Sequence, residues 1–274
     1  MLFGIIGGDR RQEELLALLR RDGYTAAACG VAGEMDWDAA VAAEVVILPL
    51  PLCKEGDTLN IEGPRRGAGA LFRQFRRDQL ILAGQVKPAQ AALAAELDLK
   101  LVDYFRREEL TVANAAATAE GTVQVILEHL ERSLLGSQCL VLGFGRIGKL
   151  LARKLRVLGA DVTVSARKAQ DLELARILGF RRIKTGNWAG ALAQYDGIVN
   201  TVPAPVVIPE HLQSIRKDCA LLELASLPGG FCTEAQALPG YLAARALPGQ
   251  YAPESAAAII RSAIFRSLNQ EEAS

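Results

Sequence analysis

The stretch CLVLGFGRIGKLLARKLRVLGADVTVSARK, residues Cys139–Lys168, decides the fold of this chain. An apolar run, Cys139–Leu142, precedes three closely spaced glycines, Gly143, Gly145 and Gly148, and a leucine-rich helical pattern and a second apolar run follow. This order of strand, glycine turn, helix and strand is typical of a dinucleotide-binding unit with parallel strands.

Each glycine has a distinct role in such a unit. Gly143 permits the tight turn, Gly145 lets the backbone approach a pyrophosphate, and Gly148 permits close packing of helix on strand. The backbone amides at the helix start, including those of Arg146 and Ile147, attract phosphate because they have no partner within the helix. We therefore predict that these residues bind a dinucleotide.

The end of the second strand indicates which dinucleotide is bound. An NAD site usually has Asp or Glu there, whose carboxylate binds the ribose hydroxyls and would repel a 2′-phosphate. This chain has Ser165 as a small donor and Arg167 and Lys168 as cations. The sequence therefore predicts NADP rather than NAD, unless the two cations belong to a solvated loop.

Two later segments follow strands and are candidates for the nicotinamide side of the site. Thr201 and Pro203 follow one buried strand, and Ala225 and Ser226 follow the next. Ligands of open α/β sheets bind at the carboxyl ends of the strands. We expect these residues to contact the cofactor, with ordinary loops as the alternative.

Strands alternate with helices along most of the chain, which predicts parallel sheets with right-handed crossovers. The strands predicted in the first series are Leu2–Ile6, Thr25–Cys29, Glu44–Leu50, Gln79–Ala83 and Leu99–Val102. Those predicted in the second are Gln138–Gly143, Asp161–Ser165, Arg182–Lys184, Gly197–Thr201, Ala220–Glu223 and Ala244–Ala246. The predicted fold class is α/β, with two Rossmann-like domains, each built on a parallel sheet.

A long helix is expected to join the two domains. The predicted parts are a substrate-side domain 1–113, an interdomain helix 114–135 and an NADP-binding domain 136–249. Thr118 is a plausible cap for the joining helix, with Glu120 in its first turn. The C-terminal segment 250–274 contains an amphipathic helix that should pack back on the first domain.

Composition excludes several classes of function. The 274 residues carry 31 basic and 31 acidic side chains, so nucleic acid and anionic membranes lack global electrostatic support as partners. No apolar run reaches the roughly 18 residues of a membrane span, and the N-terminus reads as a strand rather than a signal peptide. The five cysteines and two histidines show no metal-ligand spacing, so we predict a cytoplasmic protein without a metal site.

Motifs spread over the chain resemble one family. They are Ile6-Gly-Gly-Asp-x-Arg-Gln12, Thr118-x-Glu-Gly-Thr122, Gly136-Ser-Gln138 with the glycine turn that follows, Ala225-Ser-x-Pro-Gly-Gly230, and Leu247-Pro-Gly249 with Ala252-Pro253. Together they are similar to the family of dipicolinate synthase A-subunits, within the wider two-domain layout of formate and glycerate dehydrogenases. Arg10 departs from the small residue expected after Asp9.

The resemblance implies a reaction and partners. A family member oxidises dihydrodipicolinate, which forms from 4-hydroxy-tetrahydrodipicolinate on a branch of the lysine pathway, to dipicolinate, with NADP as hydride acceptor. It works with the flavoprotein-like B-subunit of dipicolinate synthase, as a homo-oligomer, in the cytoplasm of the mother cell during sporulation. The alternatives are a dinucleotide-binding regulatory or scaffold protein, and an NADP-dependent dehydrogenase of another small acid.

A dicarboxylate substrate requires cations or amide donors. Arg11, at the carboxyl end of the first strand, is the first candidate. The backbone at Thr118, Glu120 and Gly121, at the expected helix start, is the second, because amides there attract anions. Arg107 is the third, unless it belongs to a solvated run of charges.

The acid–base chemistry is not assigned to one residue. Asp9 is a candidate for taking a proton or orienting Arg11, although it could simply cap the following helix. His129 is a second and weaker candidate, because it shares a helix face with apolar neighbours, which favours a core or interface histidine.

Overall fold

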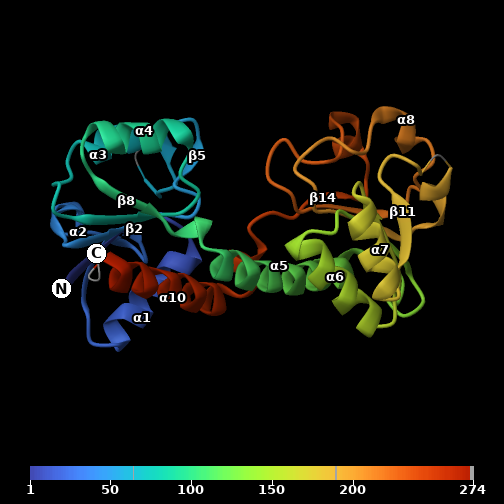
Figure 1. The fold of residues 1–274 in the computed structure, drawn as a ribbon, viewed down its shortest axis with the longest axis horizontal. Coiled ribbons are helices and arrows are strands. Elements are labelled where there is room, and N and C mark those ends of the chain that lie inside the picture. Colours follow the sequence, from blue (N-terminus) through green and yellow to red (C-terminus); the bar gives the residue numbers. More distant parts are fainter. Residues whose placement is uncertain (64, 189, 272–274) are drawn as a thin grey trace. The chain divides into compact units, whose positions relative to one another are not determined.

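The computed structural model describes residues 1–63, 65–188 and 190–271, which fold as two compact units (Figure 1). Unit 1 is Met1–Asn114 with Pro248–Ser274, and unit 2 is Ala115–Leu247. Each unit contains a six-stranded sheet. Helix α5 (Glu108–His129) begins in unit 1 and ends in unit 2.

Unit 1 has a mostly parallel sheet in the order β3-β2-β1-β4-β7-β8. Its strands are β1 (Leu2–Ile6), β2 (Thr25–Val31), β3 (Glu34–Met35), β4 (Val45–Ile47), β7 (Leu80–Ala83) and β8 (Lys100–Asp103), and β5 (Cys53–Glu55) with β6 (Thr58–Leu59) forms a separate hairpin. Its helices are α1 (Arg10–Arg21), α2 (Trp37–Ala42), α3 (Ala68–Phe72), α4 (Pro88–Glu96) and α10 (Pro253–Glu271), with a 3-10 turn at Tyr104–Arg106 and α9 (Leu247–Tyr251) at the unit boundary.

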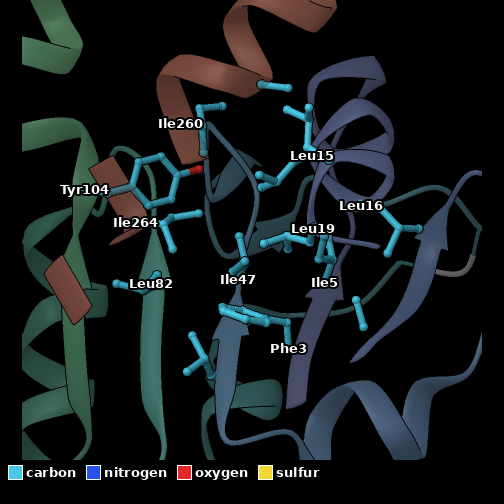
Figure 2. Close-up of a cluster of buried hydrophobic side chains, with 14 of the residues drawn as sticks. Phe3, Ile5, Leu15, Leu16, Leu19, Ile47, Leu82, Tyr104, Ile260 and Ile264 are labelled. Carbon is cyan, nitrogen blue, oxygen red and sulfur yellow. The ribbon is translucent and has the colours of Figure 1, made fainter. Parts of the chain in front are cut away.

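Alternating side chains of the strands cover the two faces of this sheet, as the pleat requires. Phe3 and Ile5 of β1 belong to a core with α1 and α10, whereas Ile6 belongs to a core with α2, α3 and α4. Figure 2 shows the first core, in which Leu15 and Leu19 of α1 and Ile260 and Ile264 of α10 meet the sheet. The predicted return of the C-terminal helix to the first unit is therefore what the structure has.

Unit 2 has a parallel sheet in the order β11-β10-β9-β12-β13-β14, the strand order typical of dinucleotide-binding folds. Its strands are β9 (Gln138–Leu142), β10 (Asp161–Ala166), β11 (Arg181–Lys184), β12 (Gly197–Asn200), β13 (Ala220–Glu223) and β14 (Tyr241–Ala243). Its helices are α6 (Arg146–Val157), α7 (Ala169–Ile177) and α8 (Pro209–Leu212), with 3-10 turns at Ala191–Gln194 and Thr233–Ala237.

The predicted α/β class with two parallel-sheet, Rossmann-like units is confirmed, and three details are wrong. β3 adds an antiparallel edge strand to the first sheet. The last strand is Tyr241–Ala243 rather than 244–246, where Ala246 has a φ of 57° that does not suit a strand. The joining helix begins at Glu108, ten residues before the expected cap, because nothing in its alanine-rich first half breaks it and Glu108 and Glu109 supply negative charge at its start.

The described helices include none with the length and apolar character needed to cross a membrane. The same residues contain no cluster of three or more His, Cys, Asp or Glu side chains placed to hold a metal ion. Cys29, Cys53, Cys139 and Cys219 are buried free thiols, and burial raises the pKa of Cys139 and Cys219 to about 12.

Candidate functional site

A pocket of about 350 Å³ lies in unit 2 where the strand order reverses, between β9 and β12. Such a reversal point, at the carboxyl ends of parallel strands, is where open α/β sheets bind ligands. The pocket is lined by Gly143, Phe144, Gly145, Lys149, Ala166, Arg167, Lys168, Asp171, Thr185, Thr201, Val202, Pro203 and Val206. It therefore brings together the predicted glycine turn, the predicted basic corner and one of the two predicted loops.

The glycines of the turn are required for different reasons. Gly143 has a φ of 96°, and a Cβ there would lie 2.5 Å from the Thr201 hydroxyl oxygen. A Cβ on Gly148 would overlap the carbonyl oxygen of Gly143, so this position needs glycine for packing of α6 on the turn. A Cβ on Gly145 would meet nothing within 4 Å. Gly145 is therefore the position where absence of a side chain leaves open space beside the backbone.

The start of α6 faces the same pocket. Gly145 is the N-cap residue and offers no side chain to bond the helix amides. The amide of Lys149 donates a hydrogen bond to the carbonyl of Gly145 at 3.0 Å. The amides before it, with the positive end of the helix dipole, form an anion-attracting surface.

Three cations and one acid surround the pocket. Arg167 and Lys168 are exposed at the end of β10, and Lys149 lies on α6 with its ammonium nitrogen 5.7 Å from the centre of the Phe144 ring. Asp171, in the first turn of α7, is the acid. The excess of positive charge suits a phosphorylated ligand.

Ser165 does not have the predicted place. Its side chain is fully buried, and its hydroxyl oxygen lies 2.9 Å from that of Thr185, which lines the pocket instead. The longer strand explains the difference, because β10 extends to Ala166 and Ser165 is therefore a buried residue paired with Ile183 of β11 rather than the exposed end of the strand.

Sequence reasoning missed several lining residues. Lys149 follows Gly145 by four positions and so lies on the same face of α6, which the helical period could have indicated. Asp171 was missed because α7 itself was not predicted, and Thr185 was missed because β11 ends in a loop without a motif.

A buried carboxylate connects the two loops that follow β12 and β13. Glu223 is 1% exposed and accepts hydrogen bonds from the Asn200 side chain at 2.7 Å and from the amides of Ala225, Gly230 and Phe231 at 2.9, 2.7 and 3.2 Å. Asn200 in turn bonds both the amide and the carbonyl of Val202, which lines the pocket. Glu223 therefore fixes the pocket wall through Asn200.

The second predicted loop is held by this network and does not itself line the pocket. Ala225 is buried, and its carbonyl accepts a hydrogen bond from Arg245 Nε at 2.9 Å. Ser226 is exposed. The loop reaches the pocket indirectly, because the carbonyl of Gly230 accepts hydrogen bonds from the amides of Val206 and Val207.

In unit 1, Arg11 and Asp9 form a pair at the carboxyl end of β1. The Nε and Nη2 atoms of Arg11 donate to the two carboxylate oxygens of Asp9 at 2.8 and 2.7 Å, and Nη2 also donates to the carbonyl of Leu50. Burial raises the pKa of Asp9, but the hydrogen bonds and charge of Arg11 outweigh this and hold that pKa below its usual value. Asp9 also caps α1, with Gln12 completing a capping box.

The expected helix start at Thr118 is wrong, and the argument that backbone amides there attract a substrate anion no longer applies. Thr118 and Gly121 lie in the interior of α5, so their amides are used within the helix and offer no anion site. Glu120 forms a salt bridge with Lys154 at 2.9 Å. It lines an open groove between α5 and α6 whose walls are mainly apolar.

Arg107 and His129 are not among the lining residues of the unit 2 pocket, and each forms bonds at the helix α5. Arg107 donates to Glu109 at 2.7 Å and to the Gln270 side chain at 2.9 Å, which ties the start of α5 to α10. His129 ends α5 with an exposed side chain, not the apolar environment expected, and its Nδ1 donates to the carbonyl of Val125 at 2.8 Å.

The comparisons with known proteins agree with the motifs. Residues 2–105 match the family model that describes the N-terminal domain of the dipicolinate synthase A-subunit. The whole chain is similar to the dipicolinate synthase A-subunit of Bacillus subtilis (strain 168), with 27% identity over 98% of this chain and 96% of that protein.

Solved structures extend this agreement to the fold. The dipicolinate synthase A-subunit from Bacillus halodurans has a TM-score of 0.84 with 25% identity, over 97% of each chain. A transhydrogenase from Sinorhizobium meliloti has a TM-score of 0.70 with 15% identity, over 99% of this chain and 94% of that one, and shares the fold alone. The resemblance to the dipicolinate synthase A-subunits seen in the sequence is thus confirmed, in the N-terminal domain by the family model and over nearly the whole chain by the similar proteins.

Proposed function

We propose that the chain is the NADP-dependent A-subunit of a dipicolinate synthase and oxidises dihydrodipicolinate to dipicolinate. The observation that carries the proposal is the unit 2 pocket, which combines an open glycine turn, an uncapped helix start and a cationic corner. The similarity to dipicolinate synthase A-subunits is the basis for the proposed substrate, which would form from 4-hydroxy-tetrahydrodipicolinate by loss of water.

The residues of the pocket fit NADP. The backbone of Gly143–Gly145 and the start of α6 would hold the pyrophosphate, since a Cβ on Gly145 would enter the open space beside the backbone. Arg167 and Lys168 would bind the 2′-phosphate, and no acid ends β10 to repel it. When bound, NADP supplies the acceptor for the hydride that leaves the substrate ring, and a proton leaves with it.

Asp171 bears on whether the pocket binds NAD or NADP. Its carboxylate lines the same pocket as the two cations, and Asp or Glu near the adenine ribose favours NAD. It follows the β10 end by five positions and stands on α7 rather than on the strand end where that carboxylate usually lies. We therefore keep the assignment to NADP, with Lys149 as an additional cation for the phosphates.

The partners and setting of the proposed enzyme are taken from its resemblance to dipicolinate synthase A-subunits. We infer that the chain forms a homo-oligomer and works with a second, flavoprotein-like B-subunit of dipicolinate synthase. Its place of action in this proposal is the cytoplasm of the mother cell of a sporulating bacterium. The lysine pathway supplies the substrate.

A dinucleotide-binding regulatory or scaffold protein is the second candidate. One observation favours it, because no histidine is among the described residues that line the unit 2 pocket. His129 bonds Val125, and Nδ1 of His211 accepts from Trp188 and from the amide of Ile208. The aromatic product strongly favours loss of the proton, so an enzyme of this kind has little need of a histidine base.

The deciding experiment mixes the purified chain with 4-hydroxy-tetrahydrodipicolinate and NADP, with and without the B-subunit. NADPH is followed by its absorbance and dipicolinate by chromatography. Equal amounts of both products, formed only when this chain is present, support the enzyme. Dipicolinate formed by the B-subunit with a Gly145→Val variant of this chain, at the wild-type rate, would instead support the scaffold.

A further inference from the structure

A second cavity of about 350 Å³ lies in unit 1, beside the β5–β6 hairpin. Its lining includes Lys54, Glu55, Thr58, Leu59, Ile61 and Arg65. None of the residues selected from the sequence for substrate binding is among them. The cavity has the size of a small-molecule site, at the lower end of the usual range.

The cavity stands at the ligand-binding edge of the unit 1 sheet. Its wall residues Leu59 and Ile61 flank Asn60, whose carbonyl accepts a hydrogen bond from the amide of Gly8 at 2.7 Å. A Cβ on Gly7 would lie 2.7 Å from the same oxygen. This segment is thus packed on the carboxyl end of β1, next to the reversal point between β1 and β4 in the order β2-β1-β4-β7-β8.

Arg11 differs from the two cavity cations, Lys54 and Arg65, in how its side chain is bonded. Arg11 is 5% exposed and its guanidinium is bonded to Asp9 and Leu50. Lys54 and Arg65 are exposed and form no salt bridge among the described residues. Lys54 lies near enough to Asp9 for its charge to contribute to the lowered pKa of that carboxyl.

We propose that the unit 1 cavity binds the carboxylate groups of a small organic acid, with Lys54 and Arg65 as the cations and the Thr58 hydroxyl as a further donor. The arginine fork matches a carboxylate in two hydrogen bonds, and the lysine adds a compact charge. Glu55, the one acid in the lining, leaves a net positive charge. The inference rests on the proposed function, for which it names the substrate-binding residues.

The chain offers a matched control beside the cavity. Arg66 adjoins Arg65 in sequence, but its guanidinium carbon lies 3.9 Å from the centre of the Trp37 ring and it does not line the cavity. Arg65→Met and Arg66→Met remove the same charge from adjacent positions. Only the first removes a donor from the cavity.

The test titrates pyridine-2,6-dicarboxylate into the full chain by calorimetry at fixed ionic strength. Lys54→Met and Arg65→Met should each weaken binding about tenfold, the effect of one charge-assisted contact. Arg66→Met should leave it within about twofold. Both cavity substitutions are at exposed positions, so circular dichroism should show an unchanged fold.

Two results would overturn the inference. Equal weakening by all three variants would mean that only long-range charge is felt, and unchanged binding in the cavity variants would place the ligand elsewhere. NADP-dependent turnover of each variant separates this failure from that of the proposed function. If turnover is normal in all of them, the function stands and the cavity assignment fails, whereas a wild-type chain that neither binds the dicarboxylate nor turns over loses both.

Discussion

The two units differ at the carboxyl ends of the two central strands of their sheets, the place where ligands bind in such folds. In unit 2 the edge between β9 and β12 is open, since Gly143 and Gly145 place no side chain there and a pocket results. In unit 1 the corresponding position beside β1 holds the guanidinium of Arg11, bonded to Asp9 and to the carbonyl of Leu50, and the cavity lies next to it, at the segment of Leu59 and Ile61.

The comparison shows that a glycine turn after a first strand is not sufficient for a phosphate site. Gly7 and Gly8 also follow a strand and precede a helix, but a side chain on either would collide with the protein itself, at Asn60 and at Gln12. A Cβ added to Gly145 would meet no atom of the protein within 4 Å. A glycine that is unnecessary for the fold indicates space kept for a ligand.

The largest effect is expected when the glycine of each turn is replaced by valine. Gly145→Val should abolish dinucleotide binding without loss of stability, because the added side chain enters open space that the pyrophosphate would need. Gly8→Val should do the opposite and lower stability while leaving NADPH affinity unchanged, since Gly8 has a φ of 121° and faces Gln12. Fluorescence titration and thermal unfolding measure the two quantities, and normal NADPH binding by Gly145→Val would refute the pyrophosphate assignment.

The second prediction concerns the carboxylate that shapes the open edge. Glu223→Gln should lower the free energy of unfolding of unit 2 by about 3 kcal/mol, because a charged acceptor of four N–H groups is replaced by an amide that meets them with its own donors. Urea unfolding followed by Trp188 fluorescence, in a Trp37→Phe background, reports unit 2 alone. Glu210→Gln, at an exposed position of the same unit, should have almost no effect.

This network marks the limit of what could be predicted from the sequence. The pattern around Gly143 predicted the turn, the helix and the parallel strands, because local glycines and apolar periods determine them. The bonds from Glu223 to Asn200 and to the loop amides depend on the pairing of β12 with β13 and could not be read from spacing. The place of Ser165 was wrong for a related reason, since β10 continues to Ala166 and leaves Ser165 buried within the sheet.

The residues of the proposed substrate site could be predicted only in part. The place of Arg11 at the end of β1 was anticipated, but its bonds to Asp9 and Leu50 depend on side-chain geometry that sequence does not give. Lys54 and Arg65 carry no motif, and only the packing of the Asn60 segment on β1 brings them to the sheet edge.

A third prediction sharpens the contrast in charge between the two edges. Replacing Arg167 and Lys168 by alanine should weaken NADPH binding by about 1–3 kcal/mol more than NADH binding, because only NADPH carries the 2′-phosphate. Lys149→Ala, which removes a cation from the other side of the pocket, should weaken both cofactors alike. Fluorescence titrations of the variants with each cofactor decide it, and equal losses in the first variant would contradict the basic-corner assignment.

The smallest expected effect tests the Asp9–Arg11 pair, through the pH dependence of unit 1 stability. The folded state holds the pKa of Asp9 below its ordinary value of 3.8, so the unfolded chain binds the proton more readily and the ionised pair stabilises the fold above that pH. The advantage of wild type over Asp9→Asn should therefore be complete near neutral pH and disappear as the pH falls through the folded-state pKa. We expect about 1 kcal/mol at most, since the Asp9 side chain is 36% exposed and solvent screens the pair.

Unfolding followed by Trp37 fluorescence in a Trp188→Phe background, from pH 3 to pH 7, measures the difference. The exposed Asp38→Asn is the matched control and should parallel wild type. If Asp9→Asn also runs parallel to wild type over that range, the Asp9–Arg11 pair occupies its position beside β1 without stabilising the fold, and the contrast between the two units is one of shape rather than of charge.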